Sequence, residues 1–390
     1  MPGRPRLFSD VTPLRESGQY RLLYLGELVA FLGSQLTVVA VPLQVYLLTR
    51  SSLAVGLVGL VQLGPLLAGS LIGGSVADAV DRRVLLIWVQ LGRAALTAGL
   101  VLNAVRPELA LWPLYLLTAG GAGLSAVDSP ARTAAVPALV RRELLPAAAA
   151  LQQILMQVGL VVGPSLAGLV VARASLAVAY ALDAATFVVA SLLAVALRPL
   201  PPGAGRTRAG LSSIREGLRY LRGRRALQGT FVIDLNAMVF GMPRALFPAL
   251  GTGLFGGGPA TVGLLYAAPG AGALVGALTA GWVGGVRRQG RAVLVAVAVW
   301  GAAITLFGLV DWLPLALGLL ALAGAADVIS AVFRNAILQL TVPDGLRGRL
   351  SAIHIAVVSG GLACLAGVAL IAWRLPELDR TTLATSEPAV

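Results

Sequence analysis

Five ionisable side chains lie inside long apolar stretches of the chain, where charge is rare. The acids are Glu27, Asp183, Asp234 and Asp327, and the base is Arg93. Because charge at membrane depth is costly, such residues are functional candidates by default. An acid that gains and loses a proton as access changes sides suits proton-coupled transport. Glu27 and Asp234 rank first for this role, Asp183 next, and Asp327 last because it lies near the end of its stretch.

Each of these residues also has a structural interpretation. An acid could instead pair with an arginine or with a helix terminus, and Arg93 is either a counter-ion to an acid or a ligand of the substrate. Around Glu27, the residues Tyr24, Ser34 and Gln35 fall within about 100° of its face by helical rotation. This polar stripe predicts a helix that faces a central cavity.

The amino-acid composition indicates that these residues lie in membrane-spanning helices. The chain is 57% apolar and 12% charged, whereas soluble domains are about a quarter charged. The net charge of +13 comes from arginines in short connections, which argues against nucleic acid as a partner. We therefore expect an all-α integral membrane protein with the lipid bilayer as its surroundings.

Several chemistries are excluded by what the sequence contains. A single cysteine, Cys364, and a single histidine, His354, exclude a disulfide framework and argue against a protein-only zinc site. Without a phosphate-binding loop, ATP-driven pumping is unsupported. The first 20 residues are too polar for a cleavable signal peptide. We expect no metal, no cofactor and no enzymatic activity.

The apolar pattern predicts about eleven spans, six before the middle of the chain and five after it. They cover residues 21–48, 54–77, 84–105, 109–127, 149–171, 175–197, 227–250, 260–283, 291–310, 313–333 and 350–373. The predicted parts are a tail (1–20), a six-helix bundle (21–197), a linker (198–226), a second bundle of about five helices (227–373) and a polar tail (374–390).

Arginine bias predicts the orientation. With the N-terminus in the cytoplasm, the inner connections are arginine-rich. The other side then holds Arg50, Arg106, Arg173 and Arg244. A multi-pass protein of the cytoplasmic membrane follows from this pattern.

The linker resembles an amphipathic basic helix. After a proline cluster, Ser213 and Glu216 have the spacing of a capping box, and leucines recur at helical spacing among arginines. Such a helix is expected to lie on the inner membrane surface; docking of a partner is the alternative.

The two halves of the chain resemble each other. The segment 65–83 matches 269–288, and the tetrapeptide around Arg132 matches the one around Arg334. A repeat at half the chain length indicates two related helix bundles around a central path.

A motif between the second and third spans carries a family resemblance. Gly74, Asp78, Arg82 and Arg83 form Gly-x-x-x-Asp-x-x-x-Arg-Arg, which resembles the cytoplasmic signature of the major facilitator superfamily of secondary transporters. That family usually has arginine after the aspartate and glycine before the basic pair, where this chain has Ala79 and Asp81. Asp78 is expected to pair with Arg82 or with a helix N-terminus.

A second motif lies in the fifth span, with Gly159, Gly163, Pro164 and Gly168 in the pattern Gly-x-x-x-Gly-Pro-x-x-Ala-Gly. Small residues on one face allow a neighbour to approach closely; packing alone is the other explanation. The motif resembles the superfamily signature associated with exporters that work as proton antiporters.

Two further segments narrow the resemblance. Residues 128–132 (Asp-Ser-Pro-Ala-Arg) and 346–350 (Leu-Arg-Gly-Arg-Leu) are similar to the branch with the enterobactin exporter and macrolide efflux proteins. The resemblance implies a two-bundle fold with normally twelve spans. It also implies a monomer that exports a siderophore or drug-like small molecule in exchange for protons. The alternatives are a small-solute importer and, because the predicted pattern is one span short of twelve, a shortened relative that does not transport.

Overall fold

The computed structural model describes residues 10–201, 243–280, 286 and 289–341, and within these ranges the chain is helical without strands. Eight of the helices in this part are long and apolar enough to cross a membrane. The elements are α1 (Thr12–Glu16), α2 (Gly18–Thr49), α3 (Ser52–Ala79), α4 (Arg82–Ala104), α5 (Trp112–Leu139), η1 (Arg142–Leu144), α6 (Leu145–Arg173), α7 (Leu176–Val195), η2 (Arg244–Leu246), α10 (Phe247–Ala249), η3 (Leu250–Leu254), α11 (Gly258–Thr279), α12 (Gln289–Phe307) and α13 (Leu313–Thr341).

Serine caps set the start of three long helices. Ser17, Ser51 and Ser175 accept hydrogen bonds from backbone N–H groups three residues further on, at 3.1, 3.3 and 3.2 Å. Each bond satisfies a donor that the first helical turn leaves without a partner. Between α2 and α3, Arg50 adopts a left-handed conformation with φ of 53°. The chain therefore reverses there within two residues.

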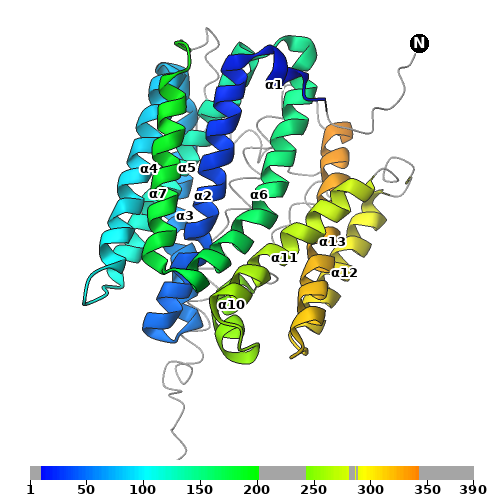
Figure 1. The fold of residues 1–390 in the computed structure, drawn as a ribbon. Coiled ribbons are helices and arrows are strands. Elements are labelled where there is room, and N and C mark those ends of the chain that lie inside the picture. The colour runs from blue at the N-terminus through cyan, green and yellow to red at the C-terminus, as the bar shows by residue number, and fades with distance from the viewer. Residues whose placement is uncertain (1–9, 202–242, 281–285, 287–288, 342–390) are drawn as a thin grey trace, which may run out of the picture.

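The helices form two bodies (Figure 1). In the first, α2–α7 alternate in direction, and the closest pairs are α3 with α5, α4 with α7, and α2 with both α6 and α7. In the second, α13 packs against α11 and α12. The two bodies meet along α6 and α11.

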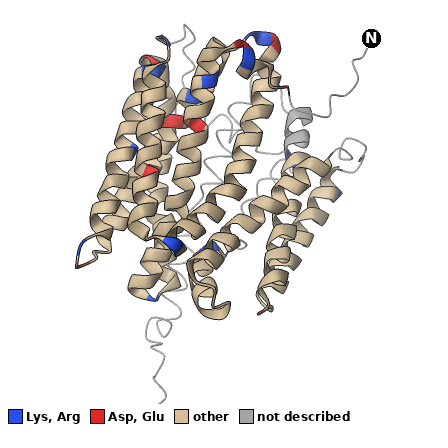
Figure 2. Cartoon of the chain, viewed as in Figure 1, with Lys and Arg blue, Asp and Glu red and all other residues tan. Residues whose placement is uncertain are grey.

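The connections at the two ends of the first body differ in charge. One end holds the α3–α4 turn with Arg82 and Arg83 and the α5–α6 connection with Arg141 and Arg142. We call this end the basic face; it lies at the top of Figure 2, where blue ribbon segments gather.

Helix α5 corrects the prediction of a span that ends at 127. It continues to Leu139, so Arg132 lies inside a helix and not in a connection. The prolines Pro130 and Pro137, which suggest a breaker in a soluble sequence, are accommodated here, as they often are in membrane helices. Arg334 likewise lies within α13, which extends past the predicted end at 333.

The signature segment, residues 74–83, lies mostly in helices and not in a loop. Helix α3 runs to Ala79 and α4 begins at Arg82, so the connection consists of Val80 and Asp81. Asp81 caps α4, because its Oδ1 accepts a hydrogen bond from the Arg83 N–H at 2.8 Å. Asp78 belongs to the last turn of α3, and its expected pairing with Arg82 or with a helix N-terminus stays a prediction.

Asp81 also holds the chain that leaves the first body. Its carboxylate accepts from the Leu200 N–H at 3.1 Å, and the Leu200 carbonyl accepts from the Arg82 N–H at 3.0 Å. The Arg83 guanidinium donates to the Val195 carbonyl at 2.6 Å. These contacts fix the end of α7 and the following residues on the basic face.

The internal repeat is visible in side-chain contacts. Arg132 bonds Asp128, four residues before it, and Arg334 bonds Ser330, also four residues before it. In the matching helix pairs, a Cβ at Gly69 of α3 would strike the backbone of α5, and a Cβ at Gly272 of α11 that of α13. Corresponding helices of each half thus pack at small residues.

Some predicted features lie outside the described residues: most of the linker with its amphipathic helix, Asp234, and the last span at 350–373. The predicted domain boundaries and the total of eleven spans stay predictions.

Candidate transport cavity

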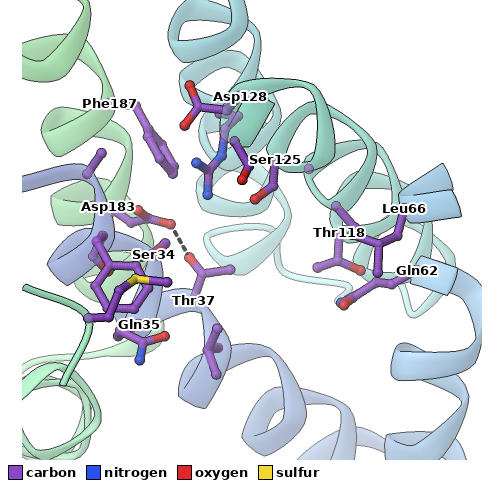
Figure 3. Close-up of a pocket in the computed structure, with 18 of the residues that line it drawn as sticks. Ser34, Gln35, Thr37, Gln62, Leu66, Thr118, Ser125, Asp128, Asp183 and Phe187 are labelled. Atoms are coloured by element: carbon purple, nitrogen blue, oxygen red, sulfur yellow. Dashed lines mark hydrogen bonds between the residues drawn. The ribbon is translucent and has the colours of Figure 1, made fainter. Parts of the chain in front are cut away.

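A cavity of about 1000 Å³ opens between the helices of the first body and is bordered by Arg244, Ala245 and Tyr266 from the second. Its charged lining residues are Glu27, Arg93, Asp128, Arg132, Asp183 and Arg244. Figure 3 shows part of the wall, with Asp183 and Thr37 at one side and Thr118 and Gln62 at the other.

Asp128 and Arg132 form a buried ion pair within α5. Arg132 Nε lies 2.6 Å from Asp128 Oδ2, and the other carboxylate oxygen accepts from Gln90 Nε2 of α4 at 3.0 Å. The carboxylate one turn earlier compensates the charge of the buried guanidinium group. This pair joins α4 and α5 beside the cavity.

Glu27 lies next to this pair, on α2. Its carboxylate accepts a hydrogen bond from the side-chain amide of Gln152 on α6, and it interacts electrostatically with Arg132 and Asp128. Glu27 therefore has a neutral direct partner, while its charged neighbours are already paired with each other.

Asp183 is the most deeply buried acid of the site, at 1% exposure on α7. The Thr37 hydroxyl of α2 bonds its Oδ2 at 2.5 Å (Figure 3), whereas Oδ1 is buried without a hydrogen-bond partner among the described residues. A buried carboxylate with one bond and one bare oxygen is costly as an anion. Its direct partner Thr37 is again neutral.

Arg93 enters the cavity from α4. Its guanidinium carbon lies 4.2 Å from the centroid of the Phe187 ring on α7, a cation–π contact. It interacts electrostatically with Asp128 and Asp183. No ion pair within contact distance joins it to either acid in the part of the chain that is described.

The glycine motif of α6 works on two faces. A Cβ at Gly159 or Gly163 would strike Phe31 or Gln35 of α2, and both of those side chains line the cavity. On the other face, a Cβ at Gly168 would lie 2.8 Å from the Gly263 Cα of α11. Small residues therefore allow α6 to pack closely against α2 within the first body and against α11 of the second body. Pro164 lies between these positions, and its carbonyl oxygen also approaches Gly263.

The structure brings together part of the predicted set. Glu27, Ser34 and Gln35 line the cavity with Arg93 and Asp183. Tyr24 does not line it and instead donates its hydroxyl hydrogen to the Leu151 carbonyl at 3.1 Å. Asp327 of α13 and the signature residues Gly74, Asp78, Arg82 and Arg83 are not among the lining residues.

Sequence reasoning missed the partners that hold the acids: Gln90, Gln152 and Thr37. It also treated Asp128 only as part of a motif. One signal was present, because an acid four residues before an arginine marks a pair on one helix face. The glutamine and threonine partners come from other helices, and no spacing rule identifies them.

The long apolar helices, the two bodies joined along α6 and α11 and the cavity lined by charged and polar groups define a multi-pass membrane transport protein. Comparison with solved structures agrees on the fold. A variant of the nucleoside transporter NupG superimposes with a TM-score of 0.73 at 9% identity, covering 89% of both chains. A D-xylose–proton symporter gives 0.66 at 15% identity, covering 93% of this chain and 90% of that one.

The family model for transmembrane secretion effectors matches residues 8–373. The enterobactin exporters of Shigella boydii serotype 18 and Escherichia coli O1:K1 are each 31% identical over 363 residues, which is 92% of this chain and 87% of each relative. The chain belongs to this family of the major facilitator superfamily.

Proposed function

We propose that the chain is a proton-coupled exporter that moves a siderophore or a drug-like amphipathic molecule across the cytoplasmic membrane by alternating access. One observation supports this proposal most strongly. Two acids of the cavity, Glu27 and Asp183, have neutral direct partners, Gln152 and Thr37. An amide or a hydroxyl can satisfy a carboxyl group with or without its proton. Asp128, in contrast, is bound to a guanidinium and serves as an anchor.

Glu27 and Asp183 are therefore our coupling residues. Asp234 keeps its place as a prediction from sequence. Asp327 is the weakest candidate, because it does not line the cavity.

The orientation follows from charge. With the basic face in the cytoplasm, as the positive-inside rule requires, the N-terminus is cytoplasmic. The bodies then meet toward the outer side, where residues 160–168 of α6 pack on residues 259–270 of α11. Figure 1 shows these helices diverging toward the basic face.

The cargo class rests on the relatives and on the cavity. The relatives named above export enterobactin. At about 1000 Å³, the cavity is at the upper end of the range for small-molecule sites. Its apolar wall carries neutral polar groups, among them Gln62, Thr118 and Ser125. All of these groups come from one chain, so a monomer suffices.

The test is proton-gradient-driven efflux of enterobactin from a strain that lacks its own siderophore exporter. Glu27→Gln and Asp183→Asn should abolish or strongly reduce efflux. The matched controls are Glu16→Gln and Asp311→Asn, which make the same chemical changes at exposed positions outside the cavity. Membrane insertion is measured for each. No efflux from the intact inserted chain would favour a non-transporting relative, and uptake would favour an importer.

A further inference from the structure

Arg93 has donors without acceptors. A guanidinium offers five N–H groups, and the part of the chain that the structure describes gives Arg93 neither a hydrogen bond nor an ion pair, only the ring contact with Phe187. Arg93 lines the cavity. Arginine at membrane depth normally pairs with an acid or with backbone carbonyls. A cation held without such partners points to an acceptor that arrives from the cavity.

The neighbouring acids do not supply that acceptor. Both oxygens of Asp128 are occupied, one by Arg132 at 2.6 Å and one by Gln90 at 3.0 Å. Asp183 bonds Thr37. These acids therefore interact with Arg93 by long-range electrostatic attraction, without a direct hydrogen bond among the described residues. They lower the cost of keeping the cation in the membrane and leave its hydrogen-bond donors unoccupied.

Phe187 determines how those donors can be used. The guanidinium carbon of Arg93 lies over the Phe187 ring, 4.2 Å from the centroid, and the planar guanidinium group of arginine stacks on aromatic faces. Phe187 is 2% exposed, so it is a fixed support. The edges of the guanidinium, which carry the N–H groups, are left for a planar pair of oxygen atoms, the arrangement that arginine binds in two-point contacts.

We propose that Arg93, supported by Phe187, binds an anionic oxygen pair of the cargo, such as a carboxylate or an ionised catechol. This assignment rests on the proposed function and narrows its cargo to organic anions. Arg93 is then the residue that selects anionic cargo, while the rest of the cavity wall accepts cargo molecules with varied apolar parts.

The experiment is equilibrium binding to the purified full-length protein in nanodiscs. The two probes are enterobactin, whose catechols ionise, and its fully O-methylated ether, which has the same skeleton without acidic hydroxyls. The intact protein should bind the catechol at least about tenfold more tightly than the ether, since hydrogen bonds between charged groups are the strong ones. In Arg93→Met the difference should disappear while affinity for the ether is kept. Arg93→Lys, which retains the charge without the planar fork, should keep part of it.

Affinity for the ether also shows that each variant is folded, and Arg106→Met is the matched control outside the cavity. Equal affinities in the intact protein, unchanged discrimination in Arg93→Met, or no binding of either probe would overturn the assignment. Its failure is separable from that of the proposed function. Arg93-dependent binding without efflux would refute export alone, and efflux that is insensitive to Arg93→Met would refute the anion site alone.

Discussion

Arg132 Nε lies 2.6 Å from Asp128 Oδ2, one helical turn away in α5, and the side chains of Arg132 and Asp128 are 10% and 12% exposed. In the second half, Arg334 bonds Ser330 at the corresponding spacing, at 3.2 Å. Both halves thus hold a buried arginine that bonds the residue four positions before it. In the body that holds the cavity, Glu27 interacts electrostatically with the Asp128–Arg132 pair.

This pair should be essential for stability. Asp128→Asn removes the charge that compensates Arg132, and breaking a buried ion pair from one side costs about 3–5 kcal/mol. Denaturant unfolding in mixed micelles should show a loss of that order. Glu16→Gln breaks the exposed pair with Arg141, whose side chains are 44% and 66% exposed, and should cost under about 1 kcal/mol. Equal losses in the two variants would contradict a special role for the buried pair.

Asp81 provides a second test. It stands where the superfamily usually has glycine, yet it caps α4 and binds the Leu200 N–H. Asp81→Ala should lower the free energy of unfolding by about 1–2 kcal/mol, the range for a lost cap. Asp81→Asn, which keeps an acceptor oxygen, should retain most of the stability. The two variants are compared by the same unfolding assay, and an equally large loss in both would show that charge, not capping, matters.

The contact between Gly168 and Gly263 should tolerate no side chain. In Gly168→Ala, the added Cβ would lie 2.8 Å from both the Gly263 Cα and the Pro259 carbonyl oxygen. Overpacking of this kind typically costs about 1–3 kcal/mol. Gly301→Ala in α12 is the control, because nothing lies within 4 Å of that position. There, alanine should be neutral or stabilising by up to about 1 kcal/mol. If Gly168→Ala matched the control in thermal stability and in efflux, this close approach would be unimportant.

Thr37 tests the partner of Asp183. Thr37→Val keeps the shape and removes the hydroxyl that bonds Asp183 Oδ2. The carboxylate would then lose the hydrogen bond that satisfies its Oδ2, while its Oδ1 has no hydrogen-bond partner among the described residues. A hydrogen bond to a charged group contributes about 1.5–3 kcal/mol, so we expect initial efflux to fall by roughly tenfold or more. Thr37→Ser should restore it. Normal efflux in Thr37→Val would remove Asp183 from the coupling scheme.

Most of the helices were predictable from hydrophobic runs. The predicted spans at 21–48 and 175–197 match α2 and α7 within about three residues at each end. Helix α5 was predicted to end too early, because Pro130 and Pro137 look like breakers and Arg132 looks like a residue of a connection. Only the three-dimensional structure shows that Asp128 neutralises that arginine inside the helix.

The residues of the candidate site were only partly predictable from the sequence. Charge in an apolar run is visible in sequence, so Glu27, Arg93 and Asp183 could be chosen in advance. Which acid bonds which neutral group depends on how the helices pack, as with Gln152 of α6 beside Glu27 of α2. No periodicity encodes such a contact between helices.

The central claim is exchange of cargo for protons through the acids of the cavity. The most direct measurement uses purified protein in proteoliposomes with a pH-sensitive dye inside and an enterobactin gradient across the membrane. The intact chain should move protons against the direction of enterobactin flow. Glu27→Gln or Asp183→Asn should abolish this movement, and Glu16→Gln should preserve it. Enterobactin flow at the same rate without any proton movement, or proton movement unchanged in both acid variants, would contradict the mechanism.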